Sequence, residues 1–177
     1  KEYVNSYVLV DTLSDLSQKD DVIITDMGFA FQNTHQGWKT KHGQRLLTNC
    51  GLAPMGWGLP AAIGAAFGTG KRILLISGDG GLMMNIQELA TVMHHKLNIK
   101  IFILNNGGYL TIKQTQQLGF EGRLMGVNQE TGISFPKWSR IAAAFDMTSF
   151  LIPNHQYLHH TLATTLNFEG PRLIEIM

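Results

Sequence analysis

Short runs of apolar, mostly β-branched residues alternate along the chain with longer segments whose apolar positions recur every three or four residues. Runs of the first kind cover residues 22–25, 73–77, 99–104, 147–152 and 172–176, and each has the length of a buried strand. The segments between them have the spacing of helices that bury one face. This alternation is typical of a doubly wound α/β fold, so we expect about six parallel strands with helices on both faces of the sheet.

Helices are expected at residues 3–16, 136–145 and 157–166, and one further helix is expected between the second and third strand runs. The apolar positions of that helix share one face, and they are Leu82, Ile86, Leu89, Ala90, Met93 and Leu97. Residues 116–135 lack such periodicity and contain several glycines. We expect them to form a mobile connection over the functional site.

Polar residues follow two of the strand runs at the points where the strands should end. Gly78-Asp79-Gly80 follows the run at 73–77, and Asn105-Asn106 follows the run at 99–104. A right-handed crossover makes these strands parallel neighbours, so Asp79 and Asn106 are expected at the same carboxyl edge, where open α/β sheets bind ligands. Carboxylate and amide oxygens suit Mg²⁺, which usually keeps phosphate and water among its ligands.

Glycines beside Asp79 allow close backbone approach, and the amides of Gly80 and Gly81 can face an anion at the start of the next helix. A different interpretation needs no ligand: Asp79 caps that helix and Asn106 makes a turn, because both residue types favour these roles. In the same way, Met55 can be core filler and Tyr109 can anchor the start of a helix.

These motifs resemble those of the thiamine diphosphate enzymes, in which a GDG motif is followed at a similar interval by paired asparagines. A second segment at residues 51–65, GLAPMGWGLPAAIGA, resembles the part of these enzymes that grips the two rings of the cofactor. The resemblance covers most of residues 20–177, and the pattern is similar to the diphosphate-binding domain of acetolactate synthases and related 2-oxoacid carboligases and decarboxylases.

The resemblance implies roles for individual residues of this chain. Asp79 and Asn106 would be side-chain ligands of Mg²⁺, and the carbonyl of Gly108 would be a third protein ligand. Met55 would wedge between the two rings of the cofactor, and the carbonyl of Ala53 would meet the exocyclic amine. Contact with thiamine diphosphate is thereby expected at Gly28, Ala53, Met55, Gly78, Asp79, Gly80, Gly81, Asn106, Gly108, Tyr109 and Leu110.

The implied reaction is decarboxylation of pyruvate or a related 2-oxoacid and transfer of the acyl group to a second carbonyl. Ile112 occupies a position where pyruvate decarboxylases have a glutamate that promotes aldehyde release. The hydrophobic residue at this position favours carboligation. Thr115 stands where acetolactate synthases have a tryptophan, and Phe29 and Ala30 replace polar residues that help to hold the diphosphate. Phosphate binding would therefore depend more on backbone amides and Mg²⁺.

The glutamate that activates the cofactor in this family lies on a pyrimidine-binding domain, and no glutamate of this chain matches its motif. We therefore expect residues 1–177 to be a single diphosphate-binding domain, a fragment or processed subunit that is nearly inert alone and completed by a pyrimidine-binding domain of a second subunit in a homodimer or tetramer. FAD, if present, would be bound outside this domain. The alternatives are a noncatalytic cofactor-binding module and the small subunit of a two-chain oxoacid decarboxylase.

Composition fits one globular core, because 44% of the residues are apolar and 15% are charged. A formal charge of +1 gives no basic footprint for nucleic acid or membrane surfaces. The single cysteine, Cys50, excludes an internal disulfide and is expected to be a small packed residue of a cytoplasmic protein. We expect the histidine pairs at 94–95 and 159–160 on the surface. His35 and His42 are expected on a loop near the site, where a substrate role is the less favoured interpretation, because loops carry function but also tolerate polar residues without one.

Overall fold

The computed structural model describes residues 2–177 and contains one six-stranded sheet. All neighbouring strands pair in parallel, in the order β2-β1-β3-β4-β6-β5. The predicted doubly wound α/β architecture is therefore confirmed. The strands are β1 (Val22–Thr25), β2 (Arg45–Leu47), β3 (Ile73–Gly78), β4 (Ile99–Leu104), β5 (Ser149–Ile152) and β6 (Arg172–Ile176).

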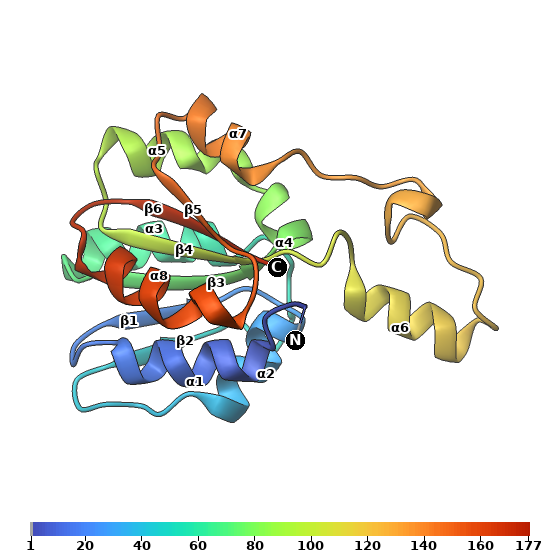
Figure 1. Cartoon of the computed structure of the whole chain (residues 1–177), viewed down its shortest axis with the longest axis horizontal. Coiled ribbons are helices and arrows are strands. Elements are labelled where there is room, and N and C mark those ends of the chain that lie inside the picture. Colours follow the sequence, from blue (N-terminus) through green and yellow to red (C-terminus); the bar gives the residue numbers. More distant parts are fainter. Residues whose placement is uncertain (1) are drawn as a thin grey trace.

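Helices cover both faces of the sheet (Figure 1). One face packs against α1 (Ser6–Leu16), α2 (Phe29–Gly37) and α8 (His155–Asn167). The other packs against α3 (Gly58–Thr69), α4 (Asp79–Met83), α5 (Leu89–His94) and α7 (Trp138–Ala144). The remaining helix, α6 (Leu110–Gly119), leads away from the sheet at the end where β4 stops (Figure 1), and it has no buried residue. Within residues 2–177, no helix is both long and apolar enough to cross a membrane.

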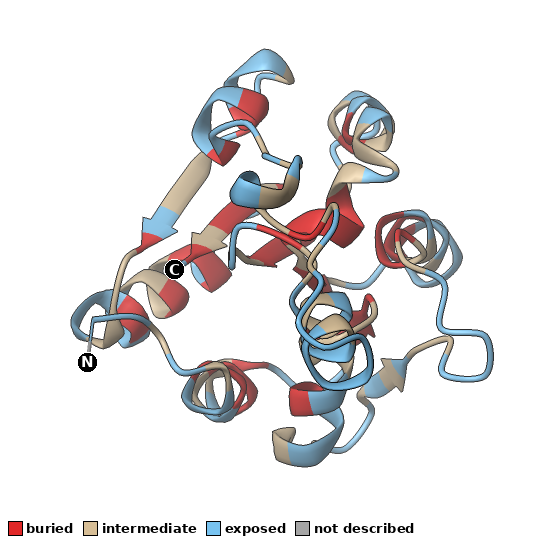
Figure 2. Cartoon of the chain, turned by 90° about the vertical axis from the view of Figure 1, so that its right-hand side faces the viewer, coloured by how far each residue is buried: buried red, intermediate tan, exposed pale blue. Residues whose placement is uncertain are grey.

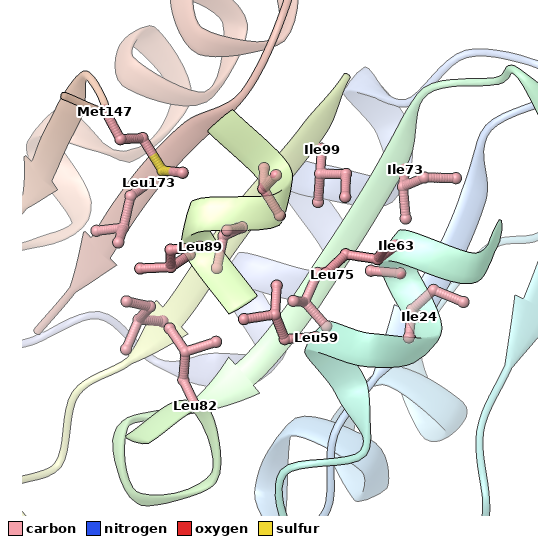
Figure 3. Packing of buried hydrophobic residues seen from close by; sticks show 14 of the residues in the cluster. Ile24, Leu59, Ile63, Ile73, Leu75, Leu82, Leu89, Ile99, Met147 and Leu173 are labelled. Atoms are coloured by element: carbon pink, nitrogen blue, oxygen red, sulfur yellow. The ribbon is translucent and has the colours of Figure 1, made fainter. Parts of the chain in front are cut away.

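Successive strand residues contribute to two separate apolar cores, because side chains alternate between the faces of a sheet. In β1 and β3, Ile24 and Leu75 face α3, whereas Ile23 and Leu74 face α1 and α2. Figure 3 shows the first of these cores, and Figure 2 shows that buried residues gather on the strands and on the helix sides that face them. Burial on both faces explains why the strands read as continuous apolar runs.

The helix predicted between β3 and β4 is wrong as a single helix. The chain forms α4, then a 3₁₀ turn at Ile86–Glu88, and then α5. Asn85 interrupts the helix with φ −133° and ψ 32°, and its side chain donates to the carbonyl of Gly56 at 2.7 Å. The apolar positions still share the predicted face, because Leu82 and Leu89 are both buried in the apolar core between the sheet and α3.

The other boundaries shift by a few residues. The helix expected at 136–145 spans Trp138–Ala144, and the strand expected at 147–152 begins at Ser149. The sixth strand is β2, which pairs with only three residues of β1 and carries no strong apolar pattern. Its short length and half-exposed position at the sheet edge explain why the hydrophobic pattern does not reveal it.

A buried lysine closes the amino edge of the sheet, opposite to the ligand edge. Lys100 on β4 is 0% exposed, and its ammonium donates to Asn98 Oδ1 at 2.8 Å, to the carbonyl of Phe168 at 2.7 Å and to the carbonyl of Gly170. Burial lowers the pKa of Lys100 to about 8, and the positive charge of Arg172 acts in the same direction. Lys100 thus ties the turn after α8 to the centre of the sheet.

Lys100→Met is expected to lower the free energy of unfolding by about 1–3 kcal/mol, because three acceptors lose their donor. The unfolded chain, with the ordinary lysine pKa of 10.5, holds this proton more tightly than the folded chain, with a pKa of about 8. The advantage of wild type over Lys100→Met should therefore grow as pH rises from about 8 to 10.5. Urea denaturation at several pH values measures both effects. Lys19→Met, at an exposed lysine, is the control and should change neither. Equal pH profiles for wild type and Lys100→Met would contradict the lowered pKa of Lys100.

Candidate active site

A cavity of about 400 Å³ opens at the carboxyl edge of the sheet. The ends of β1, β3 and β4, the loop at residues 51–57 and the first turns of α2 and α6 surround it. Every residue for which the sequence predicts cofactor contact lies in its lining, so the structure brings both motif segments together. These residues are Gly28, Ala53, Met55, Gly78, Asp79, Gly80, Gly81, Asn106, Gly108, Tyr109 and Leu110.

Asp79 fixes the loop that follows β4. Its carboxylate is 1% exposed, and its Oδ2 accepts the amides of Asn106 at 3.1 Å, Gly107 at 2.7 Å and Gly108 at 3.2 Å. Its Oδ1 accepts the amide of Gly80 at 2.8 Å. Burial raises the pKa of Asp79, and these hydrogen bonds oppose the shift. Asp79, the first residue of α4, thus accepts most of its hydrogen bonds from the loop that follows the neighbouring strand. A simple helix-capping role does not account for these bonds.

Gly80 and Gly81 pack closely against side chains of the protein, whereas a Cβ on Gly78 would meet no atom within 4 Å. A Cβ on Gly80 would lie 2.2 Å from the ring of Tyr109, and a Cβ on Gly81 would lie 2.4 Å from Oδ2 of Asp26. The amide of Gly80 donates to Asp79, which differs from the predicted orientation toward an anion. Close approach is therefore needed here for an aromatic ring and a carboxylate of the chain itself.

Two backbone positions in the lining have unusual conformations. Gly28 precedes α2 with φ 74° and ψ −142°, a combination that is essentially restricted to glycine. Ala53 has φ 48°, which is uncommon for a residue with a Cβ. Met55, two residues further on, is half-buried and borders the cavity. Strained backbone of this kind clusters at ligand-binding sites, and here it occurs at two of the predicted contacts.

Sequence reasoning missed Asp26, which also lines the cavity. Its carboxylate is 1% exposed and accepts the amide of Met27 at 2.9 Å, the hydroxyl of Ser77 at 3.1 Å and the amide of Gly56, which lies 3.1 Å from both oxygens. Burial raises the pKa of Asp26, against the effect of these donors. Asp26 follows an apolar strand run just as Asp79 does, and this signal could have identified it.

The segment at 116–135 does not lie over the cavity, which corrects the predicted placement. Its first residues, up to Gly119, complete α6, which leads away from the sheet (Figure 1). The chain returns at Val127, which is buried and whose carbonyl accepts the amide of Tyr109 at 2.9 Å. Gly108 forms a β-bridge with Asn128 there. The return of this segment is therefore anchored directly beside the loop that Asp79 holds.

Other candidate residues lie outside the cavity lining. Ile112 and Thr115 are exposed on α6, and His35 belongs to α2 and not to a loop. His42 is exposed in a loop, and the two histidine pairs are exposed as predicted. Cys50 is exposed, so its prediction as a packed residue is wrong. Among residues 2–177, no three His, Cys, Asp or Glu side chains gather as a metal site.

Comparison with known proteins gives one consistent result. The family model for the C-terminal thiamine pyrophosphate-binding domain of thiamine pyrophosphate enzymes matches residues 26–176. The large subunit of acetolactate synthase isozyme 2 from Escherichia coli is 35% identical over 96% of this chain and 30% of its own length. The large subunit of isozyme 1 from the same organism is 34% identical over 98% of this chain and 30% of its own length.

Among solved structures, the thiamine diphosphate-dependent 4-hydroxybenzoylformate decarboxylase of Rhodococcus jostii RHA1 has the same fold. The TM-score is 0.88 with 18% sequence identity, over 99% of this chain and 33% of that one. The chain therefore spans about a third of the length of these proteins. On the family match and the identity to acetolactate synthases, the chain belongs to the thiamine pyrophosphate enzymes and corresponds to their C-terminal thiamine pyrophosphate-binding domain.

Proposed function

We propose that this chain is the thiamine diphosphate- and Mg²⁺-binding domain of a 2-oxoacid carboligase or decarboxylase similar to acetolactate synthase. The reaction would be decarboxylation of pyruvate or a related 2-oxoacid with acyl transfer to a second carbonyl. The similarity to acetolactate synthases over nearly the whole chain supports this class of reaction. The cavity at the carboxyl edge, lined by both motif segments, supports this location for the cofactor.

The negative charge of the cavity lining is the main support for this proposal. Its lining contains two buried carboxylates, Asp26 and Asp79, and no lysine or arginine among the described residues. A diphosphate entering this cavity alone would meet negative charge without a compensating cation. A divalent cation bound to Asp79 would offset that negative charge and bridge the protein to the diphosphate. The site thus fits a metal diphosphate better than a free anion.

The oxygen donors beside Asp79 suit Mg²⁺. The side chain of Asn106 is exposed and makes no hydrogen bond within the described part of the chain, so its oxygen is free to coordinate. The carbonyl of Gly108 would add a backbone ligand, and diphosphate and water would complete the shell. Met55 and Ala53 would orient the rings of the cofactor. Thiamine diphosphate, when bound, supplies the carbanion chemistry, and the protein supplies orientation and exclusion of water.

The proposal includes a partner for the open side of the cavity. Ala53 borders the cavity and is exposed, as is the neighbouring Leu52, and α6 has no buried residue. A pyrimidine-binding domain, provided by a second subunit of a homodimer or tetramer, would cover this side and contribute the activating glutamate. FAD would lie outside this chain. Activity is accordingly expected of the assembled protein, and the isolated domain is expected to be inactive.

Removal of the metal is expected to abolish cofactor binding. In the gene product that contains this chain, thiamine diphosphate should bind with Mg²⁺ and fail to bind in EDTA. Asn106→Ala should weaken Mg²⁺-dependent binding by about tenfold or more, a loss of ~1.4 kcal/mol, without changing the free energy of unfolding. Asp79→Ala should abolish binding. Titration calorimetry and urea denaturation measure these quantities.

Asn105→Ala is the matched control for Asn106→Ala. The side-chain amide of Asn105 donates to Glu175 at 2.7 Å, and its oxygen accepts the amide of Gly107 at 3.1 Å, so its loss should reduce stability. Gly107 is also held by Asp79 at 2.7 Å, so metal affinity should fall less than in Asn106→Ala. Assays with pyruvate then test the reaction: acetolactate or another acyloin supports a carboligase, and an aldehyde supports a decarboxylase. Binding without turnover by the complete protein would favour a noncatalytic module. Cofactor affinity that is equal in EDTA and Mg²⁺ would contradict the proposed site.

Gly28→Ala is expected to lower the free energy of unfolding by about 1–3 kcal/mol, because alanine is strained at φ 74°, ψ −142°. It should also lower cofactor affinity, since the turn borders the diphosphate position. Gly64→Ala is the control: Gly64 lies within α3 with open space around its Cβ position, so alanine should stabilise the protein by about 0.5–1 kcal/mol and leave affinity unchanged. If Gly28→Ala binds the cofactor as wild type does, Gly28 is not part of the site.

A further inference from the structure

The peptide group of Gly56 is held from both sides by side chains of two other segments. Its amide donates to both carboxylate oxygens of Asp26 at 3.1 Å, and its carbonyl accepts the side-chain amide of Asn85 at 2.7 Å. Gly56 has φ 82°, and a Cβ there would lie 2.8 Å from Cβ of Met84. The backbone immediately after Met55 is therefore fixed in orientation as well as in position.

Asp26 is enclosed by closely packed glycines and by hydrogen-bond donors. Glycines from both sequence motifs pack against it: a Cβ on Gly58 would lie 3.0 Å from its Cβ, and one on Gly81 would lie 2.4 Å from its Oδ2. Ser77 and Met27 donate to the same carboxylate. Part of the glycine pattern of the two motifs thus makes room for a carboxylate that belongs to neither.

Asn85 holds Gly56 at the expense of helix continuity. The apolar face that runs from Leu82 to Leu89 would suit one unbroken helix, yet the chain leaves helical geometry at Asn85 and resumes it afterwards. The break forgoes backbone hydrogen bonds of the helix interior. In return, the side chain of Asn85 reaches the carbonyl of Gly56. Packing of the core alone does not require this break.

We propose that Asp26 and Asn85 are positioning residues that set the orientation of Met55 in the cavity by clamping the Gly56 peptide. A methionine side chain has three rotatable bonds and adapts to its surroundings, so its backbone must be fixed if it is to act as a rigid wedge. The inference rests on the proposed function, because the clamp matters for activity only if Met55 orients a bound thiamine diphosphate. Neither residue is proposed to touch the reacting atoms.

Asp26→Asn tests the clamp, since it keeps the size of the side chain and turns one acceptor oxygen into a donor that faces other donors. In the assembled gene product, hydrogen–deuterium exchange of the peptide covering residues 53–58 should accelerate. The induced circular dichroism of bound thiamine diphosphate should change. We expect kcat to fall about 10- to 100-fold with the KM for the 2-oxoacid unchanged, as for misoriented reactants. Asn85→Ala should act in the same direction.

The double variant Asp26→Asn/Asn85→Ala should lose less than the sum of the two single losses, because both changes release the same peptide. Asp21→Asn is the matched control. Asp21 is a buried carboxylate at the other end of β1, paired with Arg72 at 2.6 Å, so its loss should reduce stability. It should leave exchange at 53–58 and the circular dichroism of the cofactor as in wild type.

The outcomes separate this inference from the proposed function. If wild type binds no thiamine diphosphate in the presence of Mg²⁺, the proposed function fails, whatever the exchange rates are. If wild type binds and turns over, but Asp26→Asn leaves the exchange of 53–58, the dichroism and kcat unchanged, the clamp has no positioning role. Equal effects of Asp21→Asn on all three readouts would reduce Asp26 to a general contributor to stability.

Discussion

The carboxyl edge of the sheet depends on two buried carboxylates that collect hydrogen-bond donors from loops. Asp79 holds three successive amides of the loop after β4, and Asp26 holds the loop that contains Gly56. Parallel strands supply the geometry, because the register of β1 with β3 and of β3 with β4 brings all three carboxyl ends to one edge. Without these two acceptors, the amides would have to find water or other hydrogen-bond partners.

The same two carboxylates support the proposal of a cation at this edge. Burial raises the pKa of both Asp26 and Asp79, because poorly solvated surroundings disfavour their ionised forms. Their donors are neutral amides and a hydroxyl, so the charge is spread by hydrogen bonds and not neutralised by an ion pair. Asp26 packs closely against Gly58 and Gly81, whereas Asp79 lies beside the exposed side chain of Asn106. This difference supports the proposed positioning role of the first and the proposed metal binding of the second.

The sequence predicts the sheet well because strands buried on both faces must be continuously apolar. It predicts the motif at the sheet edge because Asp79 and Asn106 each follow such a strand, and the two strands are separated by one helix-length crossover. It does not predict β2, whose three residues are held by one neighbour. It also does not predict the break at Asn85, since that break is explained by a contact with Gly56, far along the chain. Contacts between single polar residues leave no periodic signal, so the roles of Asp26 and Asn85 become visible only in three dimensions.

Helix α6 and its return connect the loop at Asp79 to the open side of the cavity. Leu110 and Thr111 border the cavity at the start of α6, while Val127 and Asn128 bring the chain back to Gly108. The arm between them is exposed and carries apolar side chains, including Leu118 and Phe120. Because this arm has no buried residues, few packing contacts stabilise its geometry in the absence of a partner. A partner that packs on it would therefore act on Gly108 directly, which links the proposed assembly to the geometry of the proposed metal ligands.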